Sequence, residues 1–147
     1  MKNTFKITLK PGEKIYVNGA VIRTDRKVSL EFLNDVQFLL ENHVMQPEAA
    51  TTPLRQLYFI VQIILMSPQE AADARAMFRN SLPRLIESFE SDAIKADLKQ
   101  IDQLVAEGQV YEAMRLLRTL FAREDAILTP MPASRPAPYQ PQLLAGE

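Results

Sequence analysis

Apolar and polar positions alternate along the first forty residues of the chain, most clearly in residues 5–10 and 28–32. A period of two is typical of a strand with one buried face. Pro11–Gly12 suits a type II turn, and Asn18–Gly19 suits the two-residue turn of a hairpin. With a further short apolar run over residues 36–40, the pattern predicts four or five antiparallel strands.

From about residue 46 the spacing of the apolar residues changes to that of helices. Thr52 and Pro53 together are typical of a helix start, with a hydroxyl cap followed by proline at the first helical position. We expect this helix to continue to Met66. Apolar residues surround it almost completely, as in a central helix, so it is predicted to form the core of the second half.

Three more helices are expected after this one. The first is predicted to begin at Ser67–Pro68, with the serine as its cap, and to end or kink at Pro83. Residues 91–107 and 109–127 carry apolar residues at helical spacing, and Gly108 is a suitable stop between them. These last two helices are predicted to form an antiparallel hairpin.

The fold class is therefore α+β, with three segments. Residues 1–45 form a basic antiparallel β unit, residues 46–128 a domain of about four helices, and residues 129–147 a tail. Five prolines fall within residues 129–142, with little between them to bury, so the tail is expected to be disordered or extended. A solvated end is favoured over a docking arm.

Composition narrows the class of protein. A chain of 147 residues, 47% hydrophobic and 24% charged, is long enough for one core or for a small β unit packed on helices. No apolar run reaches the roughly 18 residues that a membrane span needs, and nothing resembles a secretory signal. The chain has no cysteine, so no disulfide or thiolate site is expected, and a cytoplasmic location fits best.

Charge is distributed unevenly along the chain. Residues 1–27 hold seven basic and two acidic side chains, a balance of +5, which leaves −6 for the rest. A basic end suits a polyanionic partner, because phosphate contacts gain from counterion release. The alternative is that the lysines only solubilise and protect an edge strand. Charge alone leaves both interpretations open.

Candidate catalytic chemistry is sparse. The chain has one histidine, His43, so no constellation with two histidines can form, and a structural role is expected for it. Asp92, Asp97 and Asp102 recur at intervals of five and do not share a helical face, so they form no acid–base pair. The chain has four glycines in all, and their spacing matches neither a P-loop nor a dinucleotide-binding fingerprint. We expect no enzyme, no cofactor and no metal site.

Three segments together carry a resemblance to a known family: residues 10–20, residues 26–34 and residues 51–59. Their lysine-proline-glycine-glutamate turn, asparagine-glycine hairpin and threonine-threonine-proline helix start resemble the FlbT family of alphaproteobacterial flagellum biogenesis repressors, over about residues 3–128. The resemblance implies a post-transcriptional regulator that associates with the 5′ untranslated region of flagellin mRNA and promotes its degradation or represses its translation.

A weaker similarity concerns the strands alone. The turn at Gly12, the hairpin at Gly19 and the alternation over residues 28–38 are similar to the carbon storage regulator family. Its members are dimers of interleaved strands that bind messenger leaders. The arginine-rich first strand of that family is replaced here by Lys6 and Lys10.

The candidate RNA-binding residues lie in the β unit. Basic side chains would contact phosphates, and Tyr16 would stack on an unpaired base, with cross-strand packing as its alternative role. The set is Lys6, Lys10, Lys14, Tyr16, Arg23, Arg26 and Lys27. Bound to a leader, the protein would block ribosomes or expose the transcript to nucleases.

A competing hypothesis is a protein-binding adaptor. In it the apolar helix of residues 53–66 forms a groove for flagellin or another flagellar regulatory protein, and effects on RNA are indirect. Three arginines of the last helix, Arg115, Arg118 and Arg123, suit either hypothesis. Exposed strand edges also leave a homodimer open.

Overall fold

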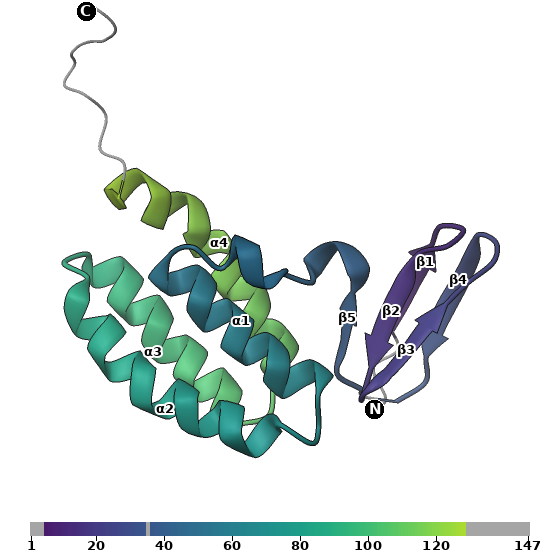
Figure 1. Ribbon diagram of the computed structural model, residues 1–147, viewed down its shortest axis with the longest axis horizontal. Helices are drawn as coiled ribbons and strands as arrows, with labels where there is room; N and C mark the ends of the chain where they lie inside the picture. The colour runs from purple at the N-terminus through teal and green to yellow at the C-terminus, as the bar shows by residue number, and fades with distance from the viewer. Residues whose placement is uncertain (1–4, 35, 129–147) are drawn as a thin grey trace, which may run out of the picture.

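The computed structural model describes residues 5–34 and 36–128. Figure 1 shows a β unit at one end of the molecule and a group of helices at the other. Within the described residues, five strands precede two short 3-10 turns, η1 (Glu41–His43) and η2 (Pro47–Ala49), and four α-helices. The predicted α+β class is confirmed, whereas residues 129–147, expected to be disordered or extended, lie outside the described residues.

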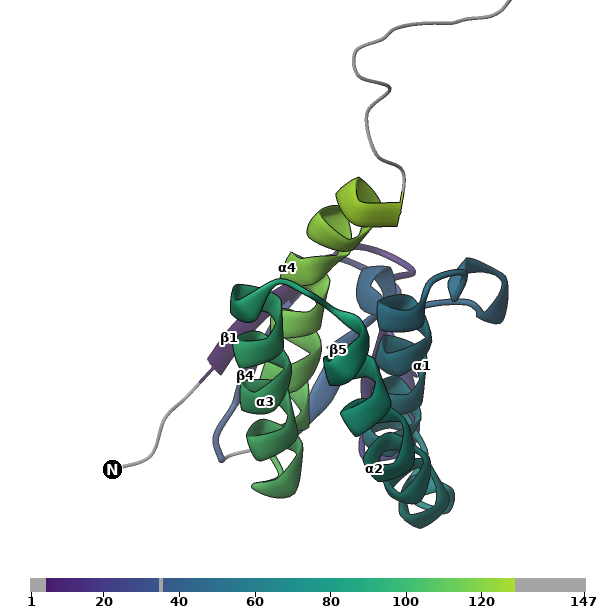
Figure 2. The same cartoon turned by 90° about the vertical axis from the view of Figure 1, so that its left-hand side faces the viewer.

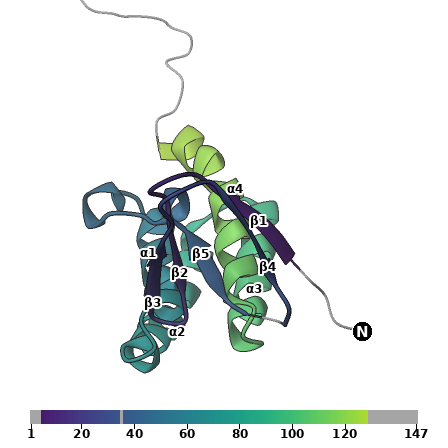
Figure 3. The same ribbon diagram turned by 90° about the vertical axis from the view of Figure 1, so that its right-hand side faces the viewer.

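The strands form two small antiparallel sheets. They are β1 (Phe5–Leu9), β2 (Lys14–Val17), β3 (Ala20–Arg23), β4 (Val28–Phe32) and β5 (Phe38–Leu40). β1 pairs with β4, and β2 lies between β3 and β5, so β3 and β5 are the edge strands of the second sheet (Figure 3). A strand was predicted from the apolar run over residues 36–40, and only the last three of these residues form β5.

The two predicted turns have the backbone that their residues favour. Gly12 has φ 78°, as the third position of a type II turn requires, and Asn18 and Gly19 have φ 49° and 87°. Positive φ at both central residues matches the right-handed twist of the flanking strands. The two-residue turn therefore places Val17 opposite Ala20 as the first pair of the hairpin.

Replacing Gly19 with alanine is expected to cost about 1–2 kcal/mol of unfolding free energy, because φ is positive there and the new Cβ would meet a neighbour. That Cβ would lie 3.1 Å from Cδ of Pro68. Gly12→Ala is the matched control, since its φ is also positive but nothing lies within 4 Å. Urea denaturation of both variants measures the difference; equal losses would mean that the contact with Pro68 costs nothing.

The helices are α1 (Pro53–Met66), α2 (Ala71–Ser88), α3 (Asp92–Ala106) and α4 (Val110–Leu128). The Thr52 side chain accepts a hydrogen bond from the Arg55 N–H, which confirms the predicted cap of α1. Gly108, with φ 82°, separates α3 from α4 as expected. Figure 2 shows the helices side by side, with α1 and α2 next to each other and α3 beside α4.

Two features of α2 differ from the sequence pattern. The helix was expected to end or kink at Pro83, and it does not end there but continues to Ser88. Pro83 itself is exposed, whereas Leu82 is buried and Leu85 and Ile86 pack on the core, so burial of this face offsets the missing backbone hydrogen bond. Ser67, expected as its cap, instead ends α1, and no side chain caps α2.

The helix α1 lies at the core of the helical half, as its apolar sequence predicted. It packs against α2, α4 and β5, and these helices share one core cluster. The largest fully buried side chains there include Tyr58 of α1 and Phe78 of α2. A second cluster lies between the two sheets and consists of Ile7, Leu9, Ile15 and Phe38.

Long-range contacts join the β unit to the helices. The Gln37 side-chain oxygen accepts a hydrogen bond of 2.8 Å from the Tyr111 N–H at the start of α4. The Phe38 ring stacks between Phe32 and Tyr111, at centroid distances of 5.0 and 5.1 Å. Gln62, buried in α1, donates to the Met45 carbonyl and accepts from its N–H, which fixes the linker on the helix. None of the described helices is long and apolar enough for a membrane span.

Candidate nucleic-acid interface

Two turns lie side by side at one end of the β unit. The Gly12 N–H donates to the Thr24 carbonyl at 2.7 Å, and the Thr24 hydroxyl donates to the Lys10 carbonyl at 3.2 Å. These bonds hold the β1–β2 turn against the β3–β4 turn, as Figure 1 shows. Lys10 from the first turn and Arg26 and Lys27 from the second are thereby brought to the same end.

Two more basic residues face each other on the adjoining strands. Lys14 of β2 lies directly opposite Arg23 of β3. Counting from the hairpin, this is a non-hydrogen-bonded pair, in which opposite side chains approach closely. Like charges in that arrangement destabilise the sheet unless an anion lies near them.

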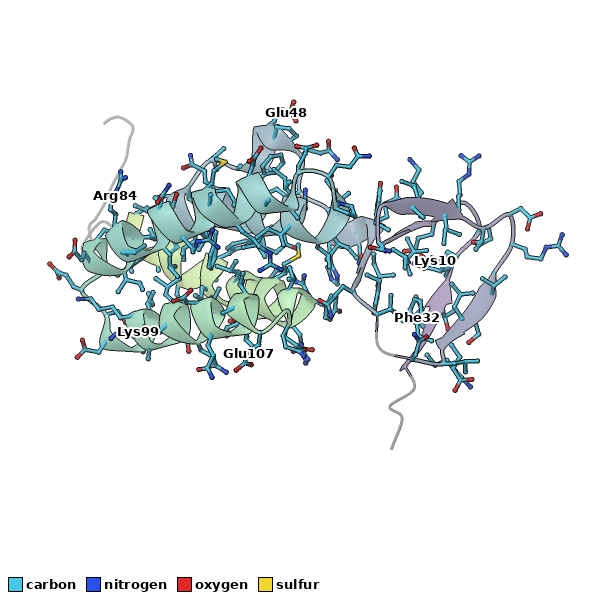
Figure 4. The ribbon with its side chains drawn as sticks, turned by 90° about the horizontal axis from the view of Figure 1, so that it is seen from below. Lys10, Phe32, Glu48, Arg84, Lys99 and Glu107 are labelled. Carbon is cyan, nitrogen blue, oxygen red and sulfur yellow. The ribbon has the colours of Figure 1, made fainter. Side chains whose placement is uncertain are left out.

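We call these five residues the basic end: Lys10, Lys14, Arg23, Arg26 and Lys27. Figure 4 shows Lys10 in the β unit, far from Arg84 and Lys99 on the helices. The basic end is exposed except for Lys14, which is half-buried. It brings residues that are up to 17 positions apart in the sequence to the same end of the β unit.

The acidic residues nearby neutralise this surface only in part. Glu13 accepts from the Lys10 N–H at 2.9 Å, and Glu41 accepts from the Lys14 N–H at the same distance. Asp25 pairs with Arg26, at 3.1 Å, where both side chains are strongly exposed. Such an exposed pair is weak, so a phosphate can replace Asp25 at low cost. Among the described residues, no ion pair engages the side chains of Lys10, Arg23 or Lys27.

Two predicted site residues lie elsewhere. Lys6 is exposed on β1, opposite Glu31 of β4, and away from the two turns. Tyr16 is half-buried and packs against the helical core, next to Leu39 in the sheet. Its ring therefore has the packing position that was the alternative to base stacking. Five of the seven predicted residues come together, and these two do not join them.

The three arginines of α4 have partners within the protein. Arg115 pairs with Glu112 at 3.6 Å, and Arg123 pairs with Asp97 at 3.3 Å. Arg118 donates to the Tyr58 hydroxyl at 3.0 Å. Arg118 and Arg123 thus join α4 to α1 and α3, whereas the exposed Arg115–Glu112 pair lies within α4. Because all three arginines have partners, they are weaker candidates for binding RNA than the basic end.

A buried carboxylate was missed by sequence reasoning. Glu124 of α4 is 1% exposed, accepts from the Thr52 hydroxyl, and accepts from the Leu54 N–H at 2.8 Å. It thus caps the positive N-terminus of α1 from another helix. One signal was available, because Glu124 falls on the buried stripe of α4 seven positions after Leu117.

Next to it, Asp125 binds Arg55 in a bidentate pair, with distances of 2.7 and 3.0 Å. The hydrogen bond from Arg55 lowers the pKa of Asp125, and the same bond raises the pKa of Arg55. The Arg55 guanidinium also lies over the Phe121 ring, 4.7 Å from its centroid. This cluster stabilises the contact between α1 and α4.

The single histidine contacts the helical core through its backbone carbonyl. The Tyr58 hydroxyl donates to the His43 carbonyl at 2.7 Å, and burial raises the pKa of Tyr58. Burial, with a smaller effect from Arg118, lowers the pKa of His43. Among the described residues, no group of three or more His, Cys, Asp or Glu side chains could hold a metal ion.

Comparison with known proteins identifies relatives over most of the chain. The family model described as flagellar protein FlbT matches residues 5–128. Two similar relatives, both called "Probable flagellum biosynthesis repressor protein FlbT", come from Chelativorans sp. (strain BNC1) and Mesorhizobium japonicum. The first is 60% identical over 88% of this chain and 89% of its own length, and the second is 62% identical over 87% of each.

A third relative, with the same description, comes from Rhizobium leguminosarum bv. trifolii and is 58% identical over 87% of this chain and 86% of its own length. No solved structure matches. The matched segment, residues 5–128, contains all five strands and four helices described above. The resemblance carried by the two turns and the threonine-proline helix start is thereby confirmed, and this chain belongs to the FlbT family of flagellar proteins.

Proposed function

We propose that this protein represses flagellum biogenesis after transcription, by binding the 5′ untranslated region of flagellin mRNA through its basic end. The relatives' description as repressors of flagellum biosynthesis supports the first part of this proposal. The chemistry of the basic end supports the second. Binding would promote degradation of the transcript or repress its translation.

The observation that carries the proposal is the opposition of Lys14 and Arg23 beside three further basic side chains. Alone, this arrangement costs stability through repulsion. A phosphate backbone removes the repulsion and releases counterions, so binding gains twice from the same charges. Because a leader's loop exposes a flexible backbone and unpaired bases, its phosphates can reach basic side chains at both turns.

The protein's role in decay is indirect in this mechanism. The basic end brings together side chains that bind phosphate, and none of them forms a nucleophile–base pair that would cut RNA. Bound across the leader, the protein occupies the site that a ribosome needs, or holds the leader in a form that a nuclease attacks. Lys6, exposed on β1, adds charge at a distance from the main contact.

Reversing the charges at Lys10, Arg26 and Lys27 to glutamate is expected to weaken binding to a flagellin leader by about a hundredfold or more, since three phosphate contacts become repulsive. The plot of log affinity against log salt should also flatten by about two, at roughly 0.7 per lost contact with a single strand. The measurement is a titration of purified protein with labelled leader RNA and a scrambled RNA at two salt concentrations.

The control carries the same charge change on the helices, at Arg79, Lys95 and Lys99, which form no ion pair among the described residues. It should bind the leader as the natural protein does. Equal weakening in both triple variants would show that net charge alone matters. Equal binding of leader and scrambled RNA by the natural protein would contradict the proposal.

A protein-binding adaptor is the second candidate, favoured by one observation. Between α1 and α2 lies a hollow of about 310 Å³, lined in part by Ile60, Leu85 and Arg84. An amphipathic segment of flagellin or of a flagellar regulatory protein suits such a surface. Filling the hollow with Ser81→Arg should abolish regulation but leave leader binding intact if the adaptor hypothesis holds, and the basic-end variant should then regulate normally.

A further inference from the structure

The outer edge of β3 offers backbone groups for a further strand. In a two-residue hairpin the residues flanking the turn, Val17 and Ala20, form a hydrogen-bonded pair, and the pairs then alternate. The Thr24 N–H donates to the Glu13 carbonyl, which fits this alternation. The N–H and C=O groups of Val21 and Arg23 therefore point away from β2, and no backbone partner meets them among the described residues.

The side chains of β3 are also exposed to solvent. All four residues of the strand are exposed. Val21 is 60% exposed on the face that packs on the helices, and Ile22 is 44% exposed on the face toward the second sheet. A short edge strand with apolar residues on both faces is unusual, because natural proteins commonly protect such edges with charge or proline. The exposed apolar surface here follows the strand edge itself.

We propose that β3 pairs with β3 of a second copy of this chain, antiparallel about a two-fold axis. The axis passes between the two Ile22 residues, so that each Val21 lies opposite the partner copy's Arg23. Since the outward groups belong to Val21 and Arg23, this register forms four backbone hydrogen bonds. The three-stranded sheet of each copy, in the order β5-β2-β3, then continues into that of the other copy, and the two form one six-stranded sheet.

The register is compatible with the charges on the strand. Arg23 is the only charged residue of β3, and an arginine opposite an arginine would repel. Centring the pair on Ile22 avoids this, because each arginine meets a valine. Antiparallel pairing also directs the two basic ends to opposite ends of the joined strands. The proposal rests on the edge of β3 and does not depend on RNA binding, although Arg23 belongs both to this edge and to the basic end.

A second copy fits this edge better than an unrelated peptide for two reasons. The strand is self-complementary in backbone pattern, the register keeps the two arginines from lying opposite each other, and the same apolar residue meets itself at the centre, as in an isologous interface. Four residues bury little surface, so the contact belongs to the small, transient class of interface. We therefore expect a concentration-dependent dimer in equilibrium with monomer.

Cross-linking tests the register directly. The natural chain has no cysteine, so Ile22→Cys introduces a single thiol. Non-hydrogen-bonded pairs place Cα atoms about 4.5 Å apart, within reach of a disulfide. Mild oxidation should convert most Ile22→Cys protein into covalent dimer. Met77→Cys, at a similarly exposed apolar position on α2, is the control and should stay monomeric. Equal cross-linking of the two variants would overturn the proposal.

Sedimentation of the full chain over a range of concentrations gives the second test. The average mass should rise toward twice the 16.7 kDa of one chain. Val21→Pro should abolish this rise, because it removes an outward N–H while leaving the bonds to β2 intact. Ile22→Lys should abolish it by placing like charges opposite each other, and circular dichroism checks folding. A natural chain that stays monomeric, or a dimer that survives both variants, would contradict pairing through β3.

Discussion

Replacing Glu124 with alanine is expected to lower the unfolding free energy by about 3 kcal/mol. The carboxylate is 1% exposed and accepts hydrogen bonds from the Thr52 hydroxyl and the Leu54 N–H. Without it, a buried donor at the start of α1 has no acceptor, and the helix loses the negative charge that offsets its dipole. Chemical denaturation of the natural protein and the variant measures the loss.

Asp125→Ala is the matched control, one residue further along α4. Asp125 also binds Arg55, but its side chain is 51% exposed, so the pair is screened by water and the change should cost less than about 1 kcal/mol. The comparison separates capping by a buried carboxylate from simple pairing with Arg55. If both variants lose equal stability, the capping of α1 by Glu124 contributes nothing beyond the ion pair.

The local features of the fold could be predicted from the sequence, because their signals lie within a few residues. Asn18 and Gly19 define a turn whatever surrounds them, and Thr52 caps the helix that begins at the next residue. The strand alternation and the helical spacing likewise depend on near neighbours. For these elements the structure agrees with the pattern of the chain.

Features that join distant segments could not be predicted in this way. Glu124 caps a helix that begins 71 residues earlier in the sequence, and Gln37 caps a helix that begins 73 residues later. Pro83 shows the converse, since a strong local signal for a helix end is overridden by burial of Leu82 and its neighbours. Tertiary packing decides each of these cases.

For the candidate site, the sequence predicted which residues are basic and that they lie on strands and turns. It predicted only in part which of them lie together in the fold. Alternation alone placed Lys6 with Lys10 and Lys14. The pairing of β1 with β4, which no local signal specifies, separates Lys6 from the other lysines. The two-residue hairpin, by contrast, already fixes the position of Arg23 opposite Lys14. Tyr16 was ambiguous for a similar reason, because whether a helix covers its face depends on the second half of the chain.

Replacing Phe38 with alanine is expected to cost about 3–5 kcal/mol, as for other buried aromatic residues. Phe38 is 5% exposed, and its ring lies between Phe32 of β4 and Tyr111 of α4, so the substitution opens a cavity where the β unit meets the helices. Beyond the global loss, we expect amides of the β strands to exchange hydrogen faster than those of the helices, which retain their own core.

Phe121→Ala supplies the control, because it removes the same side chain from a position within the helical half, beside Tyr58 and Arg55. It should destabilise the protein without selectively exposing the β strands to exchange. Hydrogen exchange measured by mass spectrometry compares the protection of the β strands in the two variants. Uniform loss of protection in the Phe38 variant would mean that the β unit and the helices unfold as one body. Selective loss would mean that the helices support the basic end through this ring, and that changes in the helical half can reach the proposed RNA contact without touching it.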